Sequence, residues 1–152
     1  MSTAADHASR AALRLRSLSW ALLGGATAAL ISLLIALLAS VLLGRLGLIP
    51  PVASGLGRAA LDAALRAGGC GFFYGLLAFH LQRVDPDDSH LQAGLVGAVC
   101  GITSLATPLQ VTDALPTVMM DVLRGWLPLW LPLVGSALLL RVVHRLLPAL
   151  RP

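Results

Sequence analysis

The chain contains no lysine, no glutamate, two cysteines and a single tyrosine among its 152 residues. Two cysteines are too few for the disulfide framework of a small secreted scaffold. Charged residues make up only 12% of the sequence, about half the fraction typical of soluble domains, whereas hydrophobic residues make up 57%. So few polar side chains cannot coat a water-soluble globule of this size, and so apolar a chain is not intrinsically disordered.

The net charge of +4 comes from eleven arginines and seven aspartates. The arginines lie at the ends of uncharged runs, such as the run from Ser17 to Gly44, and do not form one amphipathic face. Positive charge in that position orients membrane segments and contacts lipid headgroups. The charge pattern therefore indicates a multi-pass membrane protein and excludes a nucleic-acid binder.

Charged residues divide the sequence into four uncharged windows, and we expect each window to be a transmembrane helix, because an ionised side chain at the bilayer centre is costly. The predicted fold is an all-α integral membrane domain over residues 17–149, arranged as two helical hairpins between a polar N-terminal tail (1–16) and a short C-terminal tail (150–152). The predicted spans are about 18–43, 64–82, 90–109 and 124–144. The second and fourth windows hold 16 uncharged residues each. These cover about 24 Å of a hydrocarbon core of about 30 Å, so their flanking arginines must snorkel.

Orientation follows from the distribution of arginine. With both termini in the cytoplasm, seven arginines lie inside and four outside, which agrees with the positive-inside rule. The first window is about twice as long as the apolar region of a signal peptide, which favours a retained span over a cleaved leader. We therefore expect a protein of the bacterial inner membrane with cytoplasmic N- and C-termini.

The two outer connections are predicted to form short interfacial helices. Between Gly55 and Arg66 the residues Arg58, Asp62 and Arg66 recur every four positions, on one face of a helix. A second such helix is expected to start near Thr117 and reach Arg124.

A weak internal repeat accompanies these connections. An offset of 58 residues superposes Pro50 on Pro108, Arg66 on Arg124 and Arg83 on Arg141. Only six of the 37 aligned pairs are identical, so the sequence leaves open whether the two hairpins arose by duplication.

Glycine spacing predicts helix contacts. Gly71 and Gly75 in the second span, and Gly97 and Gly101 in the third, form small-xxx-small motifs that allow close approach of helix backbones. We expect these two spans to pack on each other, within one chain or between chains.

Aromatic residues predict the membrane boundaries, and one proline predicts a bend. Trp20, Trp126 and Trp130 are expected to act as interfacial anchors, and Pro132 is expected to kink the last span or shift its start.

Residues with catalytic or metal-binding chemistry are sparse. Cys70 and Cys100 are interpreted as small packing residues. The histidines near the predicted cytoplasmic face and three aspartates could supply metal ligands, but the aspartates also suit a tight turn and a helix N-cap; they are His80, His90, His144, Asp85, Asp87 and Asp88. We therefore expect no catalytic residue, no metal and no cofactor.

The function favoured by the sequence is a non-catalytic subunit, or an assembly or scaffold factor, of a larger membrane complex. Its expected partners are the lipid bilayer and a membrane protein, or a second copy of the chain, and no nucleic acid. The alternative is a small transporter or channel working as a homo-oligomer, with polar residues at its outer mouth, namely Asp62, Arg66, Asp113 and Arg124. An intramembrane enzyme is the third class, and it lacks the buried acid, base or metal cluster that such chemistry needs.

Overall fold

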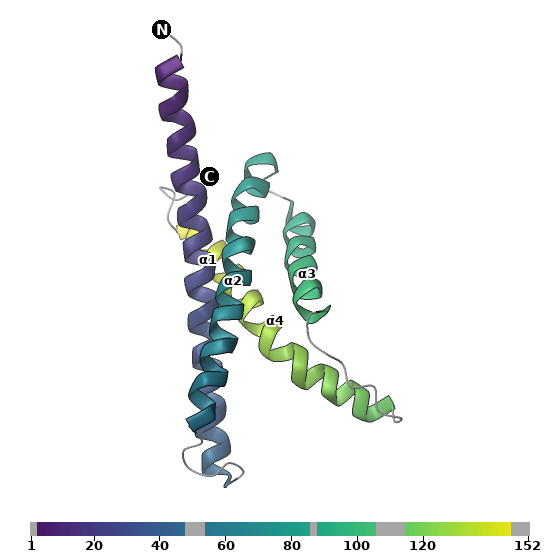
Figure 1. The fold of residues 1–152 in the computed structure, drawn as a ribbon. Helices are drawn as coiled ribbons and strands as arrows, with labels where there is room; N and C mark the ends of the chain where they lie inside the picture. The colour runs from purple at the N-terminus through teal and green to yellow at the C-terminus, as the bar shows by residue number, and fades with distance from the viewer. Residues whose placement is uncertain (1–2, 48–53, 86–87, 106–114, 147–152) are drawn as a thin grey trace.

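The computed structural model describes residues 3–47, 54–85, 88–105 and 115–146. These ranges form four helices and no strand: α1 (Thr3–Arg45), α2 (Ser54–Val84), α3 (Ser89–Leu105) and α4 (Leu115–Leu146). Successive helices run in opposite directions, so the N-terminal end of α1 and the C-terminal end of α4 point to the same side of the molecule (Figure 1). The all-helical fold is as predicted.

Two of the described helices are long and apolar enough to cross a membrane. They are the Ser9–Arg45 part of α1 and the Val118–Leu146 part of α4. The apolar part of α3, His90–Leu105, is shorter, and α2 carries three charged side chains in its first half. Crossing by α2 and α3 therefore stays a prediction.

Helix boundaries differ from the predicted spans at the outer connections. The segment from Gly55 to Arg66 is the first part of α2, and α4 begins at Leu115, so neither predicted interfacial helix is a separate element. The helix predicted over 55–66 is therefore present and leads into the rest of α2, since the prolines at 50 and 51 precede it. The interfacial position of both segments stays a prediction. At the other end of the molecule, α1 begins at Thr3 and includes most of the predicted N-terminal tail.

Helix ends follow ordinary capping chemistry where they are described. Gly47 has a φ of 67°, the left-handed conformation that glycine adopts after a helix, and it ends α1. Asp88 caps α3, because its Oδ1 accepts hydrogen bonds from the backbone N–H groups of His90 and Leu91 at 2.8 and 3.0 Å. The capping role predicted for the aspartate-rich turn is thus observed.

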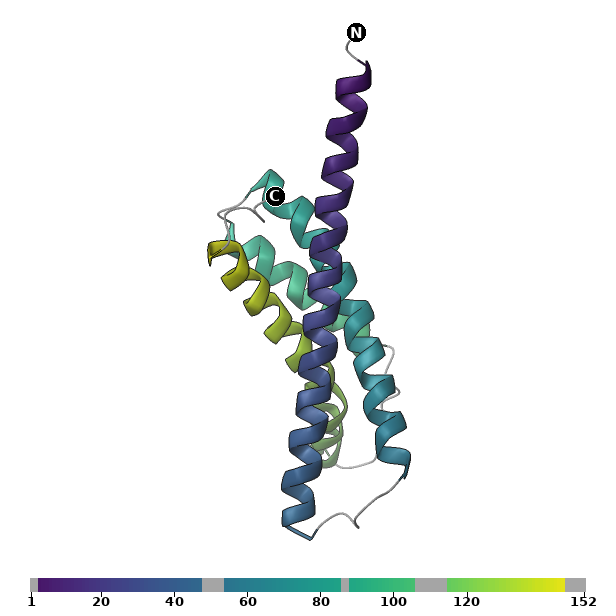
Figure 2. The same cartoon turned by 90° about the vertical axis from the view of Figure 1, so that its left-hand side faces the viewer.

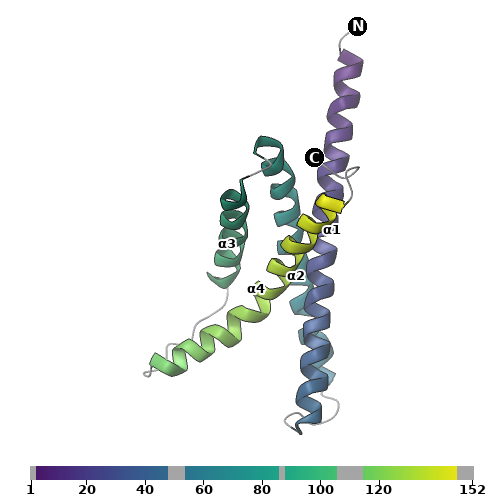
Figure 3. The same cartoon turned by 180° about the vertical axis from the view of Figure 1, so that it is seen from behind.

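Packing divides the molecule into a tight part and an open part. α1 and α2 lie side by side, and the second half of α4 crosses them (Figures 1 and 2). α3 and the first half of α4 diverge from this pair, because α4 bends part-way along its length (Figure 3). Pro128 and Pro132 lie within α4 without ending the helix, and each removes one backbone hydrogen bond, which explains the bend.

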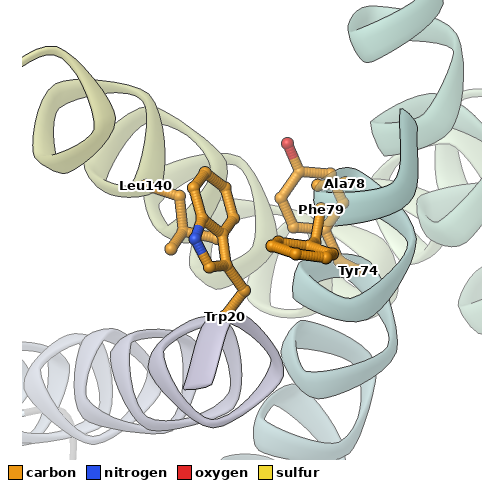
Figure 4. Close-up of a cluster of buried hydrophobic side chains, with 5 residues drawn as sticks. All are labelled: Trp20, Tyr74, Ala78, Phe79 and Leu140. Atoms are coloured by element: carbon orange, nitrogen blue, oxygen red, sulfur yellow. The ribbon is translucent and has the colours of Figure 1, made fainter. Parts of the chain in front are cut away.

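The hydrophobic core lies where α1, α2 and the last part of α4 meet. Figure 4 shows its members, which are Trp20, Tyr74, Ala78, Phe79 and Leu140. The ring centroids of Trp20 and Phe79 are 6.2 Å apart, and the Phe79 side chain is fully buried. Large apolar side chains elsewhere are exposed, including Leu34, Leu37 and Leu38 of α1. An apolar exterior around a small core is the pattern expected of a surface that faces lipid.

Candidate helix-binding and polar sites

The closest helix contact is the crossing of α1 and α2, where glycines and alanines of the two helices meet. A Cβ atom on Gly71 would overlap the carbonyl oxygen of Gly24 and lie 2.6 Å from the Cβ of Ala28. A Cβ atom on Gly75 would overlap the backbone of Trp20 and lie 3.1 Å from the Cα of Ala21. Since real Cβ atoms do not approach backbone so closely, only glycine fits at these two positions of α2.

Gly71 and Gly75 therefore have a different partner from the one predicted. The glycine spacing predicted packing of the second span on the third, whereas both glycines lie against α1. The first span carries its own small-residue series, Ala21, Gly25 and Ala29, at intervals of four. Such a series is suited to a close helix contact, but it does not by itself show which helix it meets.

Gly97 and Gly101 face open space. Among the described residues, no atom lies within 4 Å of a Cβ atom built on either glycine, and the same holds for Gly94 one turn earlier. The three glycines share one face of α3, at intervals of three and four. Cys100 and Ser104, which are buried, lie beside this face, because Cys100 precedes Gly101 and Ser104 is seven residues after Gly97. α3 thus packs along one edge of its glycine face, and the described residues leave the three glycines uncovered.

A hydroxyl pair joins α1 to α4 at the same level as the glycine crossing. Ser136 is fully buried, and its hydroxyl donates to the carbonyl oxygen of Gly24 at 2.9 Å. Its Oγ also lies 2.7 Å from Oγ1 of Thr27. Three helices therefore meet at Gly24, whose carbonyl group contacts α2 and accepts from α4.

The three tryptophans contact other aromatic rings. Trp20 is only 3% exposed, and its ring contacts Phe79 and, edge-on, the imidazole of His144 at 5.7 Å between centroids. The anchor role predicted for Trp20 is contradicted by this burial, because a belt residue keeps one edge at the membrane surface. Trp126 and Trp130 lie beside each other in α4, with centroids 5.5 Å apart.

One hydrogen bond ties α3 to α4. Trp130 Nε1 donates to Ser104 Oγ at 2.7 Å, and Ser104 in turn donates to the carbonyl oxygen of Cys100. Trp126 Nε1 is buried and has no acceptor among the described residues. Two apolar cavities border α3: one of about 340 Å³ includes Thr103 and Leu129, and one of about 240 Å³ includes Val96 and Ala137. The contact between α3 and α4 is therefore small in area.

The four residues predicted for an outer mouth are not brought together in the described part of the chain. Asp62 and Arg66 form an ion pair of 2.8 Å within α2, with side chains 62% and 65% exposed. Asp113 lies outside the described residues, as does the side chain of Arg124, whose backbone is in α4. Asp62 and Arg66 therefore form a surface ion pair within one helix.

A basic cavity lies between the N-terminal half of α1 and the C-terminal half of α2. Its volume is about 520 Å³, and its lining consists of three arginines, a serine, a histidine and three leucines: Arg10, Arg14, Arg83, Ser17, His80, Leu13, Leu18 and Leu76. Ser17 Oγ lies 3.3 Å from His80 Nε2. No acidic residue lines this cavity within the described ranges. The sequence windows did not reveal it, because Arg10 and Arg14 lie in the predicted N-terminal tail and Arg83 lies just after the second predicted span.

The histidine, cysteine and acidic side chains of the described residues do not gather in one place. No group of three histidine, cysteine or acidic side chains there is arranged to hold a metal ion. Cys70 and Cys100 are both free thiols. No protein-family model matches the chain, and neither a curated protein nor a solved structure is similar to it.

Proposed function

We propose that this chain is a non-catalytic membrane subunit that binds a larger membrane-protein complex through the glycine face of α3, formed by Gly94, Gly97 and Gly101. The observation that carries the proposal is the open space in front of that face. In a bilayer, apolar side chains gain little by leaving lipid for protein, so helices associate where small residues allow close backbone contact. A partner helix can approach α3 as closely as α1 approaches α2.

The other glycines of the chain support an intermolecular role for this face. Gly71 and Gly75 are already covered by α1, so this spacing is used inside the molecule where a partner helix is available. Each glycine in a helix interior costs about 0.5–1 kcal/mol relative to alanine. Three exposed glycines within one 17-residue helix therefore weaken α3 unless a partner helix uses the space.

The proposed placement is a bacterial inner membrane with both helical ends of the described chain on the cytoplasmic side. Two helices that could cross a bilayer support membrane insertion. The alternating helix directions put the start of α1 and the end of α4 on one side (Figure 1), and the arginine distribution favours the cytoplasm for that side.

The test is native mass spectrometry of the complex purified from its own cells in mild detergent. The wild-type chain is expected in a fixed ratio with other membrane proteins. Gly97→Leu combined with Gly101→Leu should release the chain from that complex while leaving its own helix content and melting temperature unchanged. Gly44→Leu is the matched control, because Gly44 also faces open space but lies on α1.

Three results contradict the proposal. Retention of the complex by the α3 double variant shows that another surface binds the partner. Loss of the complex in Gly44→Leu shows that a leucine at any exposed glycine is harmful. An assembly containing only copies of this chain favours the homo-oligomeric transporter, and flux measurements then replace the binding assay.

A further inference from the structure

We propose that the basic cavity between α1 and α2 binds the phosphate headgroup of an anionic phospholipid. Its position, shape and charge together support this ligand. The inference requires that α1 crosses the membrane, but it does not depend on the partner surface of α3.

Helix periodicity aligns the polar residues of the cavity. Arg10, Arg14 and Ser17 of α1 follow one another at intervals of four and three, so they lie on one face of that helix. Leu76, His80 and Arg83 of α2 have the same spacing, and α2 runs in the opposite direction. The two faces converge on one cavity, which places guanidinium groups from both helices around the same space.

Charge complementarity points to an anion. Three guanidinium groups line the cavity, and no described acidic side chain lines it. Like charges gathered in one cavity repel one another, and a bound anion relieves that repulsion. Arginine is well suited to phosphate, because its planar fork donates two parallel hydrogen bonds to phosphate oxygens.

The apolar part of the lining favours a lipid over a soluble phosphate. Ser17 begins the long uncharged run of α1, so the arginines lie just outside it and Leu18 just inside it. A phospholipid has the same order, with a charged phosphate at the membrane surface and acyl chains below it. Leu18 and Leu76 offer those chains an apolar surface next to the headgroup site. Basic pockets between helices on the cytoplasmic side are a recognised binding mode for anionic headgroups.

Arg16 provides a matched control within the same helix. It lies two residues from Arg14, which places it on nearly the opposite side of α1, and it does not line the cavity. Arg14, Arg16 and Arg83 are all exposed, so neutral substitutions at these positions should leave the fold intact.

The experiment measures lipid adducts of the full chain in detergent by native mass spectrometry, with phosphatidylglycerol and phosphatidylcholine at equal concentration. The wild-type chain is expected to retain phosphatidylglycerol preferentially. Arg14→Gln combined with Arg83→Gln should weaken that binding at least about tenfold, since a single charge-assisted hydrogen bond is worth about that factor and both arginines can donate one. Arg16→Gln should bind phosphatidylglycerol as the wild type does.

The proposal is overturned by equal retention of the two lipids, by unchanged binding in the double variant, or by an equal loss in Arg16→Gln. Adding millimolar inorganic phosphate tests whether the ligand is soluble: if phosphate displaces phosphatidylglycerol, the site binds free phosphate and the lipid assignment is wrong.

If the double variant does not fold, the melting temperature of the wild-type chain with each lipid replaces the binding measurement. Phosphatidylglycerol should then raise its melting temperature and phosphatidylcholine should not, and equal shifts reject the site. None of these results depends on the complex studied through α3.

Discussion

The α1–α2 hairpin and the α3–α4 hairpin share an order of elements but pack in different ways. In the first, glycine and alanine bring two backbones into contact. In the second, α3 reaches α4 through one tryptophan–serine hydrogen bond, and cavities lie beside it. At the 58-residue offset of the weak repeat, Gly71 and Gly75 correspond to Leu129 and Leu133.

That correspondence explains why the two hairpins differ. Both are rich in apolar side chains, so composition does not distinguish them. Glycine at positions 71 and 75 lets the carbonyl groups of α1 approach, whereas a leucine at either equivalent position carries a side chain that fills this space. The packing of the first hairpin is not repeated in the second, and α3 has 17 residues against 43 in α1. Close packing of the α1–α2 pair therefore depends on a few positions where glycine has no side chain.

The largest loss of stability is expected from a large side chain at the α1–α2 crossing, which would remove the difference in packing between the two hairpins. Gly71→Leu should destabilise the chain by about 3 kcal/mol or more, because the new side chain meets backbone that cannot move aside. Thermal unfolding in detergent, followed by circular dichroism, measures the loss. Gly44→Leu is the control and should leave the melting temperature unchanged or slightly raised, as leucine is the better helix former. A Gly71→Leu chain as stable as the wild type would show that α1 and α2 can separate at no cost.

Removal of the buried hydroxyl should have the next largest effect. Ser136→Ala deletes the hydrogen bond to Gly24 and the contact with Thr27, so we expect a loss of about 1–2 kcal/mol. The same unfolding measurement applies. Ser40→Ala is the comparison, because Ser40 is exposed and its hydroxyl donates only to the carbonyl of Leu37 in its own helix. Equal stability of the two variants would mean that α4 is not held through Ser136.

Trp130→Phe should have a smaller effect. It removes the hydrogen bond between α3 and α4, so we expect the free energy of unfolding to fall by about 1 kcal/mol, the contribution of a single neutral hydrogen bond. Hydrogen exchange of α3 amides should become faster, while exchange in α1 and α2 stays the same. Trp126→Phe is a close control, because the indole N–H that it removes has no acceptor among the described residues. If both substitutions accelerate exchange equally, ring packing rather than the hydrogen bond to Ser104 holds α3.

The smallest effect is expected at the exposed ion pair. Asp62→Asn should change stability by no more than about 0.5 kcal/mol, because an exposed pair at i, i+4 gains little in water. Unfolding of this variant should match the wild type within error. A large loss of cellular function with normal assembly and stability would instead support the transporter alternative, in which this carboxylate serves a pathway.

Several features of the fold could be predicted from residue patterns alone. Uncharged runs between charged residues located the four helices, and the aspartate before Ser89 predicted a helix cap. The helices predicted for the outer connections are the first parts of α2 and α4, and amphipathic charge spacing describes a helix face without showing whether it lies at a membrane interface. The core position of Trp20 was also missed, since an aromatic residue near the end of an apolar run has the same local pattern in a core as at an interface.

The candidate sites, too, could be predicted from the sequence only in part. The sequence predicted that Gly71, Gly75, Gly97 and Gly101 were suited to helix contacts, because spacing of four places residues on one face whatever the fold. It could not show that α1 covers the first pair while no described residue covers the second. The basic cavity combines arginines more than 60 residues apart in sequence, and no local window contains both.

By itself, then, the sequence determined that the chain is helical, that its exterior is apolar and that charged residues bound its uncharged runs. These properties depend on composition and on the helical period. The tertiary structure decided which helix face meets which partner, where Trp20 lies and which glycines stay open. Those outcomes depend on the shape match of surfaces distant in sequence: the small residues of α1 admit α2, while α3 and the first half of α4 diverge from that pair.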